Sequence, residues 1–204
     1  MSTTTYNTIS GHKPLPHLAS GSQGTGWWGI VMLLMIESAV FAGLIASYFY
    51  LFANADAWPS GDASPPDMVI PIVYSVVLLA SGLLAFLGNK AIQAGDIRRM
   101  RILRISGCVA LAIFLVLKAY EYLNLDYLWS DSAYTSILWL IAGFHTAHVI
   151  SVLLKEIVIQ VLAAKGFFTQ ERQGAIRAGT LYWSYVVLMW IPLFATLYIF
   201  PNFA

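Results

Sequence analysis

The side chains in this sequence best suited to chemistry are ionisable groups that lie within long apolar stretches. We single out Glu37, Lys118, Glu121, His145 and His148. A charged group in hydrocarbon costs several kcal/mol unless it is paired or hydrated, so such residues are retained for function or for specific polar contacts. Each of them is therefore a candidate for proton handling or for buried polar packing.

Glu37 is the strongest candidate because it lies in the middle of an apolar stretch that begins at Trp27. At about 1.5 Å of helical rise per residue, it lies about 15 Å deep, near the bilayer midplane. The same stretch carries a stripe of small residues suited to close helix contact, and Glu37 points nearly away from its middle. Two interpretations stay open, a role in proton handling and a protonated carboxyl with structural hydrogen bonds only. The small residues are Ala39, Ala42, Gly43, Ala46 and Ser47.

The other four candidates form two pairs, each spaced three residues apart, so both members of a pair share one face of a helix. Lys118 and Glu121 carry opposite charges and are predicted to neutralise each other. The alternative is that Lys118 extends to the membrane interface. His145 and His148 lie near mid-depth, where we expect polar packing between helices or contact with water and lipid headgroups.

Metal or cofactor ligation within this chain is not expected. A bis-His haem needs histidines on opposing helices, and the other histidines, His12 and His17, lie in a polar N-terminal segment. A carboxylate-bridged metal site needs Glu-x-x-His pairs on facing helices, and the stretch with His145 and His148 has none. The single cysteine, Cys108, excludes an intrachain disulfide and a four-cysteine metal site. Nucleotide-binding and hydrolase motifs are also missing, so no catalytic residue is predicted.

Membrane-spanning helices must position these residues. The chain has 204 residues, of which 59% are hydrophobic and 10% are charged, whereas a globular domain has about 25% charged residues. A bilayer core about 30 Å thick needs roughly 20 apolar residues per helix, and five stretches qualify. We predict an all-α polytopic membrane protein with a polar N-terminal tail over 1–26 and one transmembrane domain over 27–204. The predicted helices cover about 27–52, 68–92, 102–123, 135–163 and 179–200.

The distribution of Lys and Arg predicts the orientation, because cytoplasmic loops carry them in excess. The second and fourth loops are basic, whereas the first and third loops contain five Asp residues and no Lys or Arg. This asymmetry places the N-terminus in the cytoplasm and the C-terminus outside. We assign Arg104 to the second loop and expect Lys155 and Glu156 to be structural interface residues. Trp183 is expected near a helix end, within an interfacial belt of tryptophans.

Three segments of the chain resemble the subunit III family of haem–copper oxidases. The first, WWGIVMLLMIESAVFAGLIASYFYL at 27–51, has a Trp-Gly start, a mid-helix Glu, a Phe-Ala-Gly segment and a Tyr-Phe end. The second, KAYEYLNL at 118–125, is similar to the family's Ala-Tyr-Glu-Tyr segment. The third, AGFHTAHVI at 142–150, resembles its Gly-Phe-His-Gly-Leu-His-Val helix. The resemblance covers nearly everything from Trp27 onward and fits the short five-helix form, which lacks the first two helices of longer members.

The sequence also departs from the family pattern. Its last helix usually carries Tyr-Trp-His-Phe-Val-Asp-Val-Val-Trp, but YWSYVVLMW at 182–190 has Ser184 in place of His and Val187 in place of Asp. Lys118 stands where Gln is common, and Thr146 stands where the family has Gly. We therefore expect a divergent branch, to which no role of the missing His and Asp transfers.

The resemblance implies an accessory, non-catalytic subunit of a prokaryotic haem–copper terminal oxidase, a multi-pass plasma-membrane protein that packs on subunit I. It implies that haem and copper reside in partner subunits, not in this chain, and that the chain binds phospholipid. It also implies support for proton uptake and for the lifetime of the catalytic centre during aerobic respiration. By this resemblance Glu37 matches the family's buried, carbodiimide-reactive carboxyl. Glu121, His145 and His148 match its buried polar positions.

Several alternatives stay open beside this interpretation. One is an accessory protein of nitric oxide reductases with related helices, and another is a stand-alone channel or transporter. The transporter is disfavoured because the spans show no inverted repeat and the charged residues lie at different depths. Within the oxidase interpretation, the electron donor (cytochrome c or quinol), the haem types and membership of a respiratory supercomplex are open. A net charge of +1 gives no reason to expect nucleic-acid binding.

Overall fold

The computed structural model describes residues 25–61, 64, 67–169 and 173–203, which contain helices and connecting segments but no strand. Five helices are long and apolar enough to cross a membrane, which confirms the predicted fold class. Most of the predicted N-terminal tail lies outside the described residues. The helices are α1 (Thr25–Ala53), α2 (Val69–Gln93), α3 (Ile97–Leu123), α4 (Ala133–Ala164) and α5 (Gly174–Phe194). The chain then continues through a π-helical segment, Ala195–Ile199, and a 3₁₀ turn, Phe200–Asn202.

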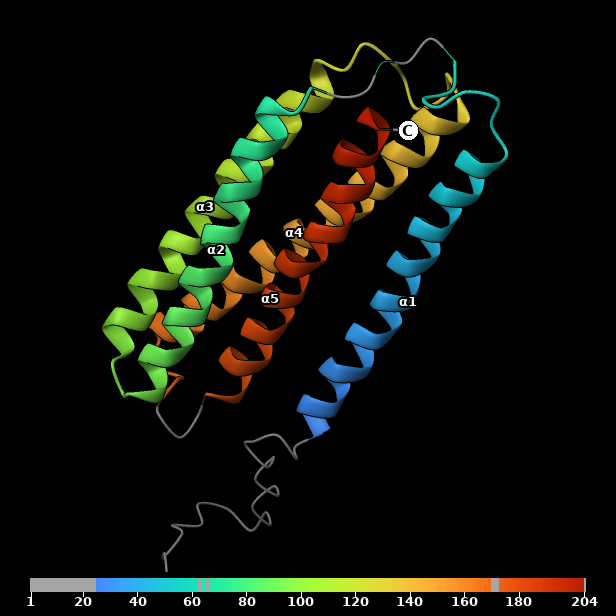
Figure 1. The fold of residues 1–204 in the computed structure, drawn as a ribbon. Helices are drawn as coiled ribbons and strands as arrows, with labels where there is room; N and C mark the ends of the chain where they lie inside the picture. Colours follow the sequence, from blue (N-terminus) through green and yellow to red (C-terminus); the bar gives the residue numbers. More distant parts are fainter. Residues whose placement is uncertain (1–24, 62–63, 65–66, 170–172, 204) are drawn as a thin grey trace, which may run out of the picture.

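The helices run alternately up and down along one axis (Figure 1). Helices α2 and α3 form one antiparallel pair, which packs against α5 and α4, while α1 packs on the α4 and α5 side. The start of α1 and the α2–α3 and α4–α5 connections lie at one end of the bundle, and the C-terminus lies at the other. The basic loops therefore share one end, and the orientation in the membrane stays a prediction from these charges.

The connection between α2 and α3 is shorter than the sequence suggested. Gly95 adopts a φ of +82°, which reverses the chain directly after α2. The carboxylate of Asp96 then accepts a hydrogen bond of 2.8 Å from the backbone N–H of Arg99 and caps α3. As a result α3 begins at Ile97 rather than at about 102. The assignment of Arg104 to a loop is wrong, because this residue lies inside α3 and is completely buried.

Helix α5 also begins earlier than predicted, at Gly174 rather than at about 179. Trp183 consequently lies well inside the helix and is fully buried, so its expected interfacial position is wrong. Its indole N–H donates to the Ser81 hydroxyl of α2 at 3.2 Å. Gly107 of α3 makes room for the ring, since a Cβ there would lie 2.9 Å from the Trp183 Cη2 atom.

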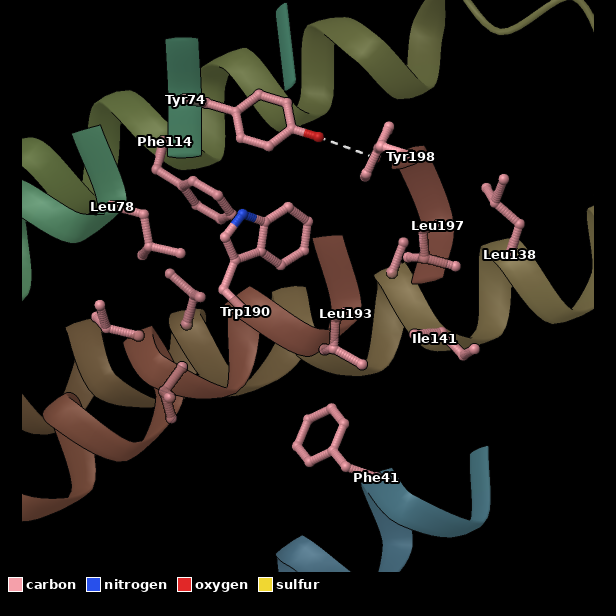
Figure 2. Packing of buried hydrophobic residues seen from close by; sticks show 14 of the residues in the cluster. Phe41, Tyr74, Leu78, Phe114, Leu138, Ile141, Trp190, Leu193, Leu197 and Tyr198 are labelled. Atoms are coloured by element: carbon pink, nitrogen blue, oxygen red, sulfur yellow. Dashed lines mark hydrogen bonds between the residues drawn. The ribbon is translucent and has the colours of Figure 1, made fainter. Parts of the chain in front are cut away.

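Aromatic side chains fill the centre of the bundle. Figure 2 shows Trp190 of α5 beside Phe114 of α3 and Tyr74 of α2, with ring centroids 6.0 and 5.8 Å away, respectively. The indole N–H of Trp190 donates to the Ser75 hydroxyl at 2.7 Å. On the other side, α1 contributes Phe41, which is 1% exposed, to the same core. This packing fixes α1 against α4 and α5 and thereby places Glu37.

Candidate functional site

Glu37 of α1 faces His148 of α4 across the helix interface. The Glu37 Oε1 and His148 Nε2 atoms are 3.6 Å apart, and both side chains are largely buried. Phe41, one turn after Glu37 on α1, lies against the His148 ring with centroids 5.1 Å apart. A second aromatic ring, Phe144, lies 4.6 Å from His148 and 5.2 Å from Phe41, centroid to centroid, so the three rings pack together. The two ionisable groups are thus held next to each other by apolar rings, in an environment where an isolated charge is costly.

The hydrogen bonds of His148 restrict where its proton can lie. Its Nδ1 atom is 2.7 Å from the Phe144 carbonyl oxygen, which can only accept, so Nδ1 carries a hydrogen. In neutral His148 the Nε2 atom therefore presents a lone pair to Glu37. The pair can hold one proton in two ways, as a neutral acid beside a neutral imidazole or as a carboxylate beside an imidazolium. This arrangement is chemically able to store and release a proton.

Polar groups of α4 and α5 continue from this pair. The Tyr182 hydroxyl of α5 lies beside Glu37 and is 2.9 Å from the Ser151 hydroxyl of α4. Tyr185, one turn further along α5, has its hydroxyl 3.2 Å from the Ser38 hydroxyl of α1. Sequence reasoning missed both tyrosines. Their position relative to Glu37 depends on how α5 packs against α1, which the spacing within α5 does not reveal.

His145 belongs to the aromatic core rather than to the Glu37 pair. It is fully buried, and its Nε2 atom lies 3.0 Å from the Val186 carbonyl oxygen. Its ring lies 4.7 Å from Trp190, centroid to centroid. The two histidines therefore have different hydrogen-bond partners, although both rings contact Phe41.

Lys118 and Glu121 form an ion pair near the C-terminal end of α3, with the Lys118 Nζ and Glu121 Oε2 atoms 2.5 Å apart. Two tyrosines complete this polar cluster. Lys118 donates to the Tyr198 hydroxyl at 2.6 Å, and the Tyr74 hydroxyl donates to the Tyr198 hydroxyl at 2.8 Å (Figure 2). Tyr198 in turn donates to Glu121 at 2.9 Å. Lys118 is 1% exposed, so this ammonium group is neutralised inside the bundle and does not extend to the interface.

A second buried ion pair, which the sequence analysis missed, joins α3 to α4. Arg104 donates to both carboxylate oxygens of Glu156, each at 2.6 Å, and its third nitrogen donates to the Thr180 hydroxyl at 2.8 Å. Glu156 is fully buried, so its expected interface position is wrong. Lys155 instead donates to the Gly179 carbonyl at 2.8 Å. The burial of Glu156 could have been predicted from helical periodicity, because Glu156 shares one helix face with Val152 and Ile159, which are both buried.

Within the part of the chain that the structure describes, no group of three or more His, Cys, Asp or Glu side chains is placed to hold a metal ion. The ionisable groups described above form ion pairs and hydrogen bonds, within α3 for Lys118 and Glu121 and between helices for Arg104 and Glu156.

Comparison with known proteins identifies similar sequences in one family. The family model described as cytochrome c oxidase subunit III matches residues 7–202. Cytochrome c oxidase subunit 3 of Thermostichus vulcanus is 30% identical over 176 residues, which cover 86% of this chain and 87% of that protein. The Corynebacterium diphtheriae protein of that name is 33% identical over 176 residues, 83% of this chain and 85% of the relative. The Synechocystis sp. protein is 29% identical over 202 residues, 97% of this chain and 82% of the relative.

Proposed function

The chain belongs to the cytochrome c oxidase subunit III family, and from this we propose that it is the accessory, non-redox subunit of a haem–copper terminal oxidase. It is a multi-pass protein of a prokaryotic plasma membrane. Haem and copper belong to partner subunits, which reduce O2 and pump protons. This chain supports proton uptake and the lifetime of the catalytic centre.

The observation that carries this role is the Glu37–His148 pair between α1 and α4. Most groups in a membrane interior cannot exchange protons, whereas a carboxyl and an imidazole that face each other can hold one between them. The hydroxyls of Tyr182 and Ser151 extend the polar contacts away from the pair. We assign Glu37 and His148 to proton handling. Lys118, Glu121 and His145 serve as buried polar groups that fix the helices.

The outer surface of α1 provides the contact with subunit I in this proposal. The small residues of this helix, from Ala39 to Ser47, are exposed on the side away from the bundle. A Cβ added at Gly43 would meet no atom within 4 Å, so a partner helix can approach closely there. Phospholipid covers exposed apolar side chains on the remaining surface, such as Met35, Val76 and Leu83.

The substitution Glu37→Gln tests the assignment in the complete oxidase complex. We expect normal assembly, slower proton uptake and fewer turnovers before inactivation, because the amide cannot exchange the proton. The matched control is Asp56→Asn, which removes an exposed carboxylate from the α1–α2 connection. Unchanged turnover and lifetime in the Glu37→Gln complex would reduce Glu37 to a structural residue.

Purification of the tagged chain from its native membrane tests the wider proposal. An oxidase subunit co-elutes with haem-containing polypeptides that consume O2. Co-elution with a haem protein that reduces nitric oxide instead would favour the nitric oxide reductase alternative. A transporter would elute alone and without haem absorption.

A further inference from the structure

Two hydroxyl groups lie between the Glu37 carboxyl and the outer surface of α4. The Tyr182 side chain of α5 is 8% exposed, and its hydroxyl lies beside Glu37. The same hydroxyl is 2.9 Å from the hydroxyl of Ser151, which lies on the exposed side of α4. The three groups therefore form a series that begins inside the bundle and ends at its surface.

The other groups around Glu37 are poorly suited to pass on a proton. The Glu37 Oε2 atom is buried and has no hydrogen-bond partner among the described residues. The rings of Phe41 and Phe144 pack against His148 and carry no exchangeable hydrogen. The two nitrogens of His148 already face other groups, Nδ1 the Phe144 carbonyl and Nε2 the Glu37 carboxyl. Tyr182 is therefore the hydroxyl best placed to exchange a proton with the pair.

The direction of the hydrogen bonds in this series depends on whether Glu37 is protonated. The Ser151 hydroxyl donates to the His148 carbonyl at 2.8 Å, and a hydroxyl has a single hydrogen to donate. Tyr182 then donates to Ser151, which leaves the lone pairs of the Tyr182 oxygen for a protonated Glu37. When Glu37 is a carboxylate, the reverse order is favoured, in which Ser151 donates to Tyr182 and Tyr182 donates to Glu37. Rotation of the two hydroxyls converts one order into the other.

Lys155 indicates where water reaches the series. It lies one helical turn after Ser151 on α4, towards the basic end of the bundle, and is partly exposed. Among the described residues it forms no ion pair, and its ammonium group donates to the Gly179 carbonyl at 2.8 Å. An ammonium group has three donors, and water at a membrane interface supplies acceptors for the other two. This ammonium lies 5.2 Å from the centre of the Tyr182 ring, so the water is close to both hydroxyls.

We propose that Ser151 and Tyr182 relay protons between water at Lys155 and the Glu37 carboxyl. During uptake, Ser151 accepts a proton from this water and gives its own hydrogen to Tyr182, while Tyr182 gives its hydrogen to the Glu37 carboxylate. The net result is one proton moved from water to Glu37, and both hydroxyls are regenerated. This role rests on the proposed proton handling by Glu37 and adds the route, which starts towards the basic end of the bundle.

Hydrogen–deuterium exchange of the Glu37 carboxyl tests the relay in the full chain, reconstituted in nanodiscs of phosphatidylcholine and phosphatidylglycerol. The sample is acidified until the infrared C=O band of protonated Glu37, identified by its absence in Glu37→Gln, is present. The shift of this band to lower frequency is then followed after transfer to D2O. We expect Tyr182→Phe and Ser151→Ala each to slow the exchange by about ten-fold or more, because each removes a positioned proton donor. An unchanged band position before transfer shows that the surroundings of Glu37 are intact.

Tyr185→Phe is the matched control, because it removes a hydroxyl one turn further along α5. This hydroxyl contacts Ser38, whose own hydroxyl donates to the Leu34 carbonyl, so the contact ends within α1. Exchange in Tyr185→Phe should proceed at the wild-type rate. The conservative variant Ser151→Thr keeps a hydroxyl at the surface end of the series, so it should also retain the wild-type rate.

Exchange at the wild-type rate in Tyr182→Phe or in Ser151→Ala would overturn the relay, because Glu37 would then exchange by another route. Equal slowing in Tyr185→Phe would overturn it as well. Slow exchange in Tyr182→Phe, together with unchanged turnover of the complete oxidase in Glu37→Gln, would support the relay and refute the proposed function of Glu37. Impaired turnover in Glu37→Gln with wild-type exchange in Tyr182→Phe would refute the relay alone.

Discussion

Arg104 of α3 donates two hydrogen bonds of 2.6 Å to the carboxylate of Glu156 of α4, and both side chains are completely buried. The third bond of the guanidinium, to Thr180, brings α5 into the same contact. The Trp183 ring lies 5.8 Å from the guanidinium carbon and covers it. Three helices are therefore fixed at one point near the basic end of the bundle.

Removing one partner of this pair should be strongly destabilising. Glu156→Leu leaves the Arg104 guanidinium buried without its counter-charge, and we expect a loss of about 3–5 kcal/mol. The double variant Arg104→Met, Glu156→Leu should be closer to wild type, because it leaves no buried charge. Thermal unfolding of the purified chain in detergent measures the difference. A double variant less stable than the single one would contradict this account.

Gly107 should tolerate no side chain, because it lies against Trp183. A Cβ at this position would be 2.9 Å from the Trp183 Cη2 atom, and the ring is fully buried and cannot move away easily. Overpacking of this kind costs about 1–3 kcal/mol, so Gly107→Ala should lower the unfolding temperature. The matched control is Gly143→Ala in α4, where a Cβ would meet no atom within 4 Å. This variant should be neutral or slightly more stable, and equal losses in both would reject the steric explanation.

Features that depend on the pattern of neighbouring residues could be predicted from the sequence. Long apolar stretches separated by polar segments predicted five spanning helices, because a helix satisfies its own backbone hydrogen bonds in lipid. The contact between Lys118 and Glu121 also followed from their spacing, since both belong to one helix. Helix starts were less accurate, because the caps at Asp96 and Gln173 lie in polar segments that resemble loops.

Contacts between helices could not be predicted in the same way. Arg104 and Glu156 are 52 positions apart in the sequence. Glu37 and His148 are also far apart in the sequence, because they lie on α1 and α4. Each pair forms only because of the particular rotation and depth of the two helices. Tyr198 reaches Lys118 from a π-helical segment after Pro192, a backbone irregularity that hydropathy does not indicate. The ionisable residues were therefore identifiable, but most of their partners were not.

The small-residue face of α1 should be necessary for assembly with the partner subunit. Gly43→Leu adds a bulky side chain on the exposed side of the helix, so the isolated chain should fold normally while a partner helix can no longer approach. Co-purification of haem with the tagged chain should then be lost. Ala112→Leu, on the exposed side of α3, is the control and should retain the haem-containing partner. Full haem recovery with Gly43→Leu would exclude this face as the contact.

Lys118 and Glu121 should show strong energetic coupling, because removal of Glu121 leaves the buried Lys118 ammonium without its counter-charge. In Glu121→Leu the Lys118 ammonium retains the hydroxyls of Tyr74 and Tyr198, which are 3.2 and 2.6 Å away, and contacts with aromatic rings such as that of Trp190. These neutral groups cannot balance the charge of an ammonium that is 1% exposed. The double variant Lys118→Met, Glu121→Leu removes both charges, so it should be more stable than Glu121→Leu alone. A double-mutant cycle of unfolding free energies should give a coupling of about 1–3 kcal/mol. Additive losses would mean that the two groups do not neutralise each other, and Glu121→Gln, which keeps the acceptor but not the charge, would then separate hydrogen bonding from electrostatics.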